Sequence, residues 1–170
     1  MNIERTASHL SITALTTLAG LHVAWGLGSS WPLPDRESFS DAVVGRPKAP
    51  GPKACYAVAC ALGSAALLVA GRPKHRPALS QLGTAGVAGV LALRGIAGLS
   101  GHTDLLSPGS TSTRFRRLDR LAYSPLCLAL SASTAIAAIR RNNQMRSTEH
   151  AMRWRLCQGT SAPAPTTRRP

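Results

Sequence analysis

Charged side chains are missing from long stretches of the chain, and these gaps are the clearest pattern in the sequence. No Asp, Glu, Lys or Arg occurs in residues 6–34, 54–71, 77–93 and 121–139. A helix that crosses a bilayer needs about 20 mostly apolar residues. The third gap reaches that length because Arg94, near its end, is followed by further uncharged residues. The pattern therefore predicts four transmembrane helices, at residues 8–28, 54–72, 79–99 and 121–139.

A soluble, alanine-rich helical bundle is the alternative that this pattern disfavours. Helices on the surface of a soluble protein carry charged residues every three or four positions, and the four stretches carry none. The mean hydropathy of +0.01 averages apolar helices with polar loops and a basic tail. We therefore expect an all-α fold, with a four-helix transmembrane bundle in residues 1–141 and a basic tail in residues 142–170.

The basic residues indicate an orientation rather than a nucleic-acid partner. The net charge is +13, but the basic residues lie in loops and tail, without aromatic interleaving or a recognisable nucleic-acid-binding module. Lys and Arg in short flanking segments favour the cytoplasmic side. One side of the predicted topology holds eleven of them and the other side eight, apart from Arg94. We therefore expect both termini in the cytoplasm and the loops 29–53 and 100–120 outside.

The C-terminal tail divides into two parts. Residues 142–157 contain basic residues together with Met145, Met152, Trp154 and Leu156. This composition predicts a short basic helix on the anionic inner leaflet, where each basic residue contributes about 1 kcal/mol. Residues 158–170 are rich in Pro, Thr and Ala, which predicts disorder.

No cofactor or metal site is expected from the sequence. The four cysteines form no CxxC motif, and there is no HExxH, P-loop or GxSxG motif. His9 and His22 lie thirteen residues apart, or roughly 20 Å along one helix. No other predicted helix contains a histidine, which disfavours a haem held between two helices.

Polar and aromatic residues gather at one end of the predicted bundle. The first and third helices run outward, and the second and fourth begin at the outer side. Six residues come to that outer end, as a candidate pocket: His22, Trp25, Tyr56, Arg94, Asp119 and Tyr123. Charges inside membranes tend to pair and to face the bundle interior, so Arg94 and Asp119 are a candidate ion pair. The alternative is that the aromatic residues anchor at the interface and that Arg94 extends to the lipid headgroups.

Three segments resemble a known family in the order and spacing of their motifs. They are "LHVAWGLGSSWP" (21–32), "LRGIAG" (93–98) and "RFRRLDRLAYSPLCLAL" (114–130). Together they resemble the bacterial membrane family called domain of unknown function 3995, over roughly residues 15–135. The resemblance attaches to these residues: His22, Trp25, Gly26, Arg94, Gly98, Asp119, Tyr123, Ser124, Pro125 and Cys127. It implies a four-helix protein of the bacterial inner membrane and implies no known activity. After Arg94 this chain has "GLSGHTDLLSPGSTS" where the family has an aromatic continuation similar to "GDFRYVGF".

The sequence is compatible with several functions. The first is a binding or accessory membrane protein whose outer pocket holds a lipid headgroup, a quinone-like molecule or a partner helix. The second is an enzyme acting on a lipid or isoprenoid, with His22 as general base and Tyr123 or Asp119 assisting. A small transporter and a purely structural protein are further alternatives. The expected partners are the lipid bilayer and a lipid headgroup or membrane protein, and the sequence does not indicate an oligomeric state.

Overall fold

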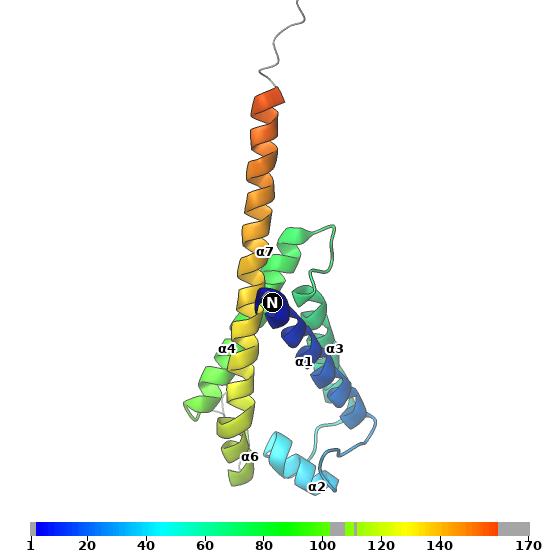
Figure 1. The fold of residues 1–170 in the computed structure, drawn as a ribbon. Helices are drawn as coiled ribbons and strands as arrows, with labels where there is room; N and C mark the ends of the chain where they lie inside the picture. Colours follow the sequence, from blue (N-terminus) through cyan, green and yellow to red (C-terminus); the bar gives the residue numbers. More distant parts are fainter. Residues whose placement is uncertain (1–2, 103–107, 111, 160–170) are drawn as a thin grey trace, which may run out of the picture.

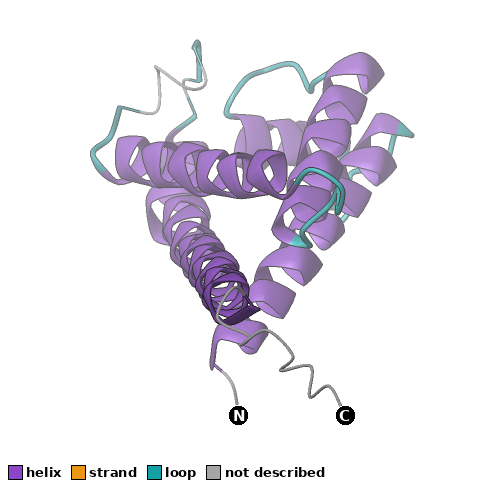
Figure 2. Cartoon of the chain, turned by 90° about the horizontal axis from the view of Figure 1, so that it is seen from above, coloured by secondary structure: helices purple, strands orange, loops and turns teal. Residues whose placement is uncertain are grey.

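Every regular element that the structure describes is helical (Figure 2). The structure is a computed structural model, and it describes residues 3–102, 108–110 and 112–159. In chain order the elements are α1 (Ile3–Gly26), α2 (Arg36–Phe39), the π-helical turn η1 (Ser40–Val44), α3 (Pro52–Val69), α4 (Pro77–Leu99), α6 (Thr113–Leu118), the π-helical turn η2 (Asp119–Tyr123) and α7 (Ser124–Gly159). The expected all-α fold class is therefore confirmed for the described residues.

Three helices in the described residues are long and apolar enough to cross a membrane. They are α3, α4 and the continuous helix Thr113–Arg155, as a multi-pass membrane protein requires. The helix α1, with 24 residues, is also long enough to span, but it does not belong to this set. Its serine, threonine and histidine residues make it more polar than the other long helices. Three of the four predicted membrane spans are thus supported by the described residues.

The helix boundaries agree with the prediction for the first three helices and differ for the last one. Against the predicted residues 8–28, 54–72 and 79–99, α1, α3 and α4 differ by five residues at most. The last helix was expected over residues 121–139, but α6, η2 and α7 form one helix. At a rise of 1.5 Å per residue, α7 alone is about 54 Å long, which exceeds the roughly 30 Å hydrocarbon thickness of a bilayer.

This length corrects the expectation for the tail. Residues 142–159 continue α7 along its own axis, away from the other helices (Figure 1). They do not form the separate short helix that the sequence suggested, because no glycine or proline interrupts residues 126–158. Disorder was predicted for residues 158–170, but residues 158 and 159 belong to α7. Residues 160–170 lie outside the part of the chain that the structure describes.

The long helices pack as two pairs, α1 with α3 and α4 with α7. The pairs are joined mainly by α1 against α7, where the Ser11 and Ser133 hydroxyls lie 2.6 Å apart. Within the second pair, the Ser131 hydroxyl donates to the Ala88 carbonyl oxygen at 2.8 Å. Such hydroxyl contacts contribute about 0.6 kcal/mol each in membranes. The pairs lie close together near the middle of α7 and diverge toward α2 (Figure 1).

Arg141 joins three helices at the end of the bundle opposite α2. Its Nη2 donates to the Val69 carbonyl oxygen at 2.6 Å, a group that the end of α3 leaves without a partner inside the helix. Its Nη1 donates to the Ser80 and Thr84 hydroxyls of α4 at 3.0 and 3.1 Å. A single guanidinium from α7 therefore holds the end of α3 against the beginning of α4.

The first loop folds back between the diverging pairs as a short helical segment (Figure 1). We call residues 35–45 the roof. Asp35 begins α2 by accepting hydrogen bonds from the Ser38 amide at 2.7 Å and the Ser38 hydroxyl at 3.0 Å. These two bonds, the amide bond first, hold the pKa of the exposed Asp35 carboxyl below its ordinary value. The sequence prediction treated this segment only as a loop.

Candidate functional site

A cavity of about 430 Å³ lies beneath the roof, between the two helix pairs. Its wall is mostly apolar and includes several aromatic residues. It is lined by Leu18, His22, Trp25, Phe39, Val43, Val44, Pro50, Ala54, Cys55, Val58, Arg94, Phe115, Tyr123, Leu126 and Cys127. Pockets for small molecules occupy about 300–1,000 Å³ and combine apolar walls with a few polar groups. This cavity therefore has the size and lining of a ligand site.

Three rings in contact with one another form one wall of the cavity. The His22 and Trp25 rings lie 4.7 Å apart in an edge-to-face arrangement, and the Trp25 and Phe39 rings lie 5.0 Å apart. His22 Nδ1 lies 2.8 Å from the Leu18 carbonyl oxygen. Because a carbonyl oxygen can only accept, Nδ1 carries the proton in this bond, and Nε2 of the neutral ring is the acceptor. Trp25 Nε1 donates to the Trp31 carbonyl oxygen at 2.7 Å, which ties α1 to the loop that leads to the roof.

Contacts at η1 and at Gly45 attach the roof to the opposite helix pair, and the Ser112 amide donates to the Gly45 carbonyl oxygen at 3.3 Å. The Tyr123 hydroxyl donates to the Ala42 carbonyl oxygen at 3.2 Å. Gly45 ends the roof with φ of 73°, a left-handed conformation that suits glycine. A Cβ atom at Gly45 would lie 2.6 Å from the ring of Phe115. Glycine is therefore needed there both for the turn and for the close approach of α6.

Arg94 and Asp119 form an ion pair between α4 and η2. Arg94 Nη2 donates to Asp119 Oδ1. The Asp119 side chain is fully buried, whereas 27% of the Arg94 side-chain surface is exposed. A buried carboxylate is tolerated in such a place only when it is paired. The pair thus places a neutralised guanidinium in a mostly apolar cavity wall.

The ion pair is packed directly against the backbone of Gly98. A Cβ atom at Gly98 would meet the Ser124 hydroxyl, and would lie 2.6 Å from Asp119 Oδ2 and 2.8 Å from Arg94 Nη1. Within the described part of the chain, Arg94 Nη1 and Ser124 Oγ are buried without a hydrogen-bond partner. Leaving a buried polar group unpaired costs about 1–3 kcal/mol. The backbone of α4 at Gly98 is therefore in close contact with a polar cluster in which two buried groups lack a hydrogen-bond partner.

The six candidate pocket residues separate into three groups. His22, Trp25, Arg94 and Tyr123 line the cavity. Asp119 is in contact with Arg94 and does not belong to the lining. Tyr56 also lies outside the lining, and its ring packs against Gly26, where a Cβ atom would come within 2.6 Å of it. Tyr56 lies apart because it is on the face of α3 that packs against α1.

The residues of the roof and of α6 were not among the candidates. Phe39, Val43, Val44 and Phe115 all line the cavity. One signal could have found the first three, since Asp35 and Ser38 form a helix-start pattern followed by apolar residues at helical spacing. Among the described residues, no three His, Cys, Asp or Glu side chains form a group that could hold a metal ion.

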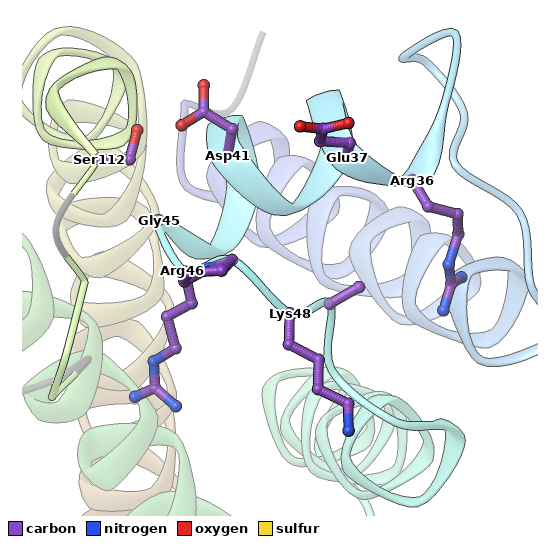
Figure 3. A pocket seen from close by; sticks show the side chains of 9 residues that line it. Arg36, Glu37, Asp41, Gly45, Arg46, Lys48 and Ser112 are labelled. Atoms are coloured by element: carbon purple, nitrogen blue, oxygen red, sulfur yellow. The ribbon is translucent and has the colours of Figure 1, made fainter.

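A second hollow, of about 590 Å³, is lined by residues of the roof, by residues of the loop that follows it and by Ser112. Figure 3 shows Glu37 and Asp41 projecting to one side of the roof, and Arg46 and Lys48 projecting to the other. The side chains of Glu37, Arg46 and Lys48 are exposed. Mixed charges on an exposed surface are typical of a solvated face, so the cavity beneath the roof is the stronger candidate site.

Comparison with known proteins gives a family and no characterised relative. A family model described as "Protein of unknown function (DUF3995)" matches residues 15–134. This range includes all six candidate pocket residues. No curated protein matches the chain, and no solved structure does.

The ion pair predicts an asymmetric double-mutant cycle. We expect Arg94→Gln to lower the free energy of unfolding by about 3–5 kcal/mol, because it removes the partner of a buried carboxylate. Asp119→Asn should lower the free energy of unfolding by a smaller amount, because the partly exposed Arg94 can turn toward solvent. The double variant should be no less stable than Arg94→Gln alone. Thermal unfolding in detergent measures all three, and additive losses would show that the two residues are not coupled.

The close approach at Gly98 predicts a second difference. Gly98→Ala should lower stability by about 1–3 kcal/mol, because the new methyl group forces the ion pair and Ser124 to move. Gly89→Ala is the matched control, since a Cβ atom at Gly89 meets nothing within 4 Å. Equal unfolding temperatures for the two variants would contradict the packing described for Gly98.

Proposed function

The chain belongs to the DUF3995 family of proteins of unknown function, and we propose that it is a membrane protein that binds an amphipathic molecule in the cavity beneath the roof. The observation that carries this proposal is a single arginine in an apolar, aromatic-rich wall. Arginine offers five N–H donors, and Asp119 accepts from one of its two terminal nitrogens. Nη1 is buried against Gly98, and the donors that remain on Nε and Nη2 suit an oxygen atom on a ligand.

The charge of the site favours an uncharged head group. Asp119 already neutralises Arg94, so an anionic ligand would add an uncompensated charge in a region of low dielectric constant. A carbonyl or hydroxyl oxygen can accept a hydrogen bond from Arg94 without adding charge. The rings of Trp25, Phe115 and Tyr123 then offer apolar faces to the body of the ligand.

A catalytic role for His22 is the second candidate. The hydrogen bond from Nδ1 to the Leu18 carbonyl oxygen leaves Nε2 as the basic atom of a ring that lines the cavity. An enzyme acting on a lipid would use such a nitrogen as a general base. The binding function ranks first because it needs only the groups that line the cavity, whereas catalysis also needs a defined reacting atom next to Nε2.

We propose that α1 is the fourth span and that both termini are cytoplasmic. Residues 6–34 carry no charged side chain, and α1 packs along α3, which is apolar enough to cross a membrane. The roof and the cavity then lie at the outer side, and the extension of α7 enters the cytoplasm. A span need not be uniformly apolar where it packs against neighbouring helices.

Mass spectrometry of lipids that co-purify with the protein tests the binding function. We expect an uncharged lipid to be enriched with the wild-type protein. The double variant Arg94→Gln, Asp119→Asn should reduce its amount at least about tenfold, the loss expected when one hydrogen bond to a charged donor is removed. This variant keeps two side chains that can hydrogen-bond to each other, which protects the fold.

Tyr56→Phe is the control, because Tyr56 lies outside the lining. It should leave the amount of bound lipid unchanged. Equal lipid content in the wild type and in the double variant would exclude Arg94 as a ligand contact.

Cysteine labelling tests the orientation. In a background without the native cysteines, Lys48→Cys should react with a membrane-impermeant maleimide in intact cells, and Arg146→Cys should react only after permeabilisation. Both positions are exposed, so access to the reagent depends on the side of the membrane. The reverse pattern would place the cavity at the cytoplasmic side.

A further inference from the structure

A second apolar hollow runs along the membrane-spanning part of the molecule, between α3 and α4. It measures about 600 Å³, and every residue that lines it is apolar. The lining consists of Leu15, Ala57, Val58, Ala61, Leu62, Ala65, Gly86, Val87, Val90 and Leu91. Val58 is 43% exposed and Val90 is 67% exposed, so the hollow is open toward the side of the bundle. We call it the lateral groove.

The lateral groove lies next to the cavity beneath the roof. Val58 lines both hollows. On α4, Gly86 and Val90 line the groove and Arg94 lines the cavity, and residues at intervals of four share one face of a helix. On α1, Leu15 belongs to the groove, and Leu18 and His22 belong to the cavity, again on one face. Each of these two helices thus carries a stripe that passes from one hollow to the other.

We propose that the lateral groove holds the apolar chain of the molecule whose head group occupies the cavity. The ligand is then an uncharged lipid with a head group that accepts a hydrogen bond and with a long apolar chain, and it reaches the site sideways from the membrane. From Gly86 to Arg94 the stripe on α4 is about 12 Å long, which a chain can follow. A partner helix, about 10 Å across with its side chains, could cover the groove but could not continue into the cavity.

This inference rests on the proposed binding function and adds the class of ligand and its route. The glycines of α4 offer a clean test, because a Cβ atom at either Gly86 or Gly89 meets nothing within 4 Å. Gly86 lines the groove and Gly89 does not. Gly86→Leu should therefore fill the groove without disturbing the fold, and Gly89→Leu is the matched control.

The experiment uses the fluorescence of Trp25, which lines the cavity. Trp31→Phe and Trp154→Phe remove the other two tryptophans, which are 66% and 67% exposed. The full chain, in phosphatidylcholine nanodiscs, is titrated with a benzoquinone that carries a decyl chain and with the same benzoquinone without the chain. Both probes present carbonyl oxygens, and quinones quench indole fluorescence.

We expect saturable quenching by the decyl probe and at least about tenfold weaker binding of the probe without a chain. Gly86→Leu should weaken the binding of the decyl probe about tenfold, the effect of excluding two methylene groups from the groove. It should leave the affinity of the probe without a chain unchanged. Gly89→Leu should alter neither. If Gly86→Leu binds the decyl probe as well as Gly89→Leu does, or weakens both probes equally, the groove does not hold the chain. If quenching by both probes is unchanged in the double variant Arg94→Gln, Asp119→Asn, the proposed binding function fails as well.

Discussion

The buried ion pair between Arg94 and Asp119 is the interaction on which the arrangement of this bundle depends. An arginine in a membrane-spanning helix needs a partner or a route to water. Here the partner is a fully buried carboxylate at the first residue of the π-helical turn η2. The two side chains meet beside Gly98, because only a residue without a side chain lets them come so close to α4. The pair therefore determines both the contact of α4 with η2 and the position of the guanidinium at the cavity.

The second helix pair is held at both ends, and this explains why a cavity forms. The ion pair joins α4 to the long C-terminal helix near α2, and Arg141 joins the same helices to α3 at the opposite end. Near α2 the pair α1–α3 diverges from α4–α7 (Figure 1), and the roof lies between them. The roof contributes Phe39, Val43 and Val44 to the cavity, so the wall of the hollow on this side consists of apolar side chains.

Much of the fold, and part of the site, could be predicted from local patterns. Gaps in the charge pattern located α1, α3 and α4 to within five residues, because charged side chains inside a bilayer are costly and rare. Depth along the helices brought His22, Trp25, Arg94 and Tyr123 to one end, and these four line one cavity. Tyr56 shares their depth but lies against Gly26 instead. The depth of a residue specifies its position along the helix axis. It does not specify whether the residue lies on the face that packs against a neighbouring helix.

The sequence by itself determined the helical class and the apolar segments, since each follows from composition over a short stretch, and it offered Arg94 and Asp119 as a candidate ion pair. Only the tertiary structure decided that residues 35–45 form the roof and that a lateral groove lies next to the cavity, with Val58 lining both. These features arise from contacts between residues far apart in the chain, such as Tyr123 with Ala42. The physical reason is that packing angles between helices depend on all the side chains at a contact, and no single segment contains that information.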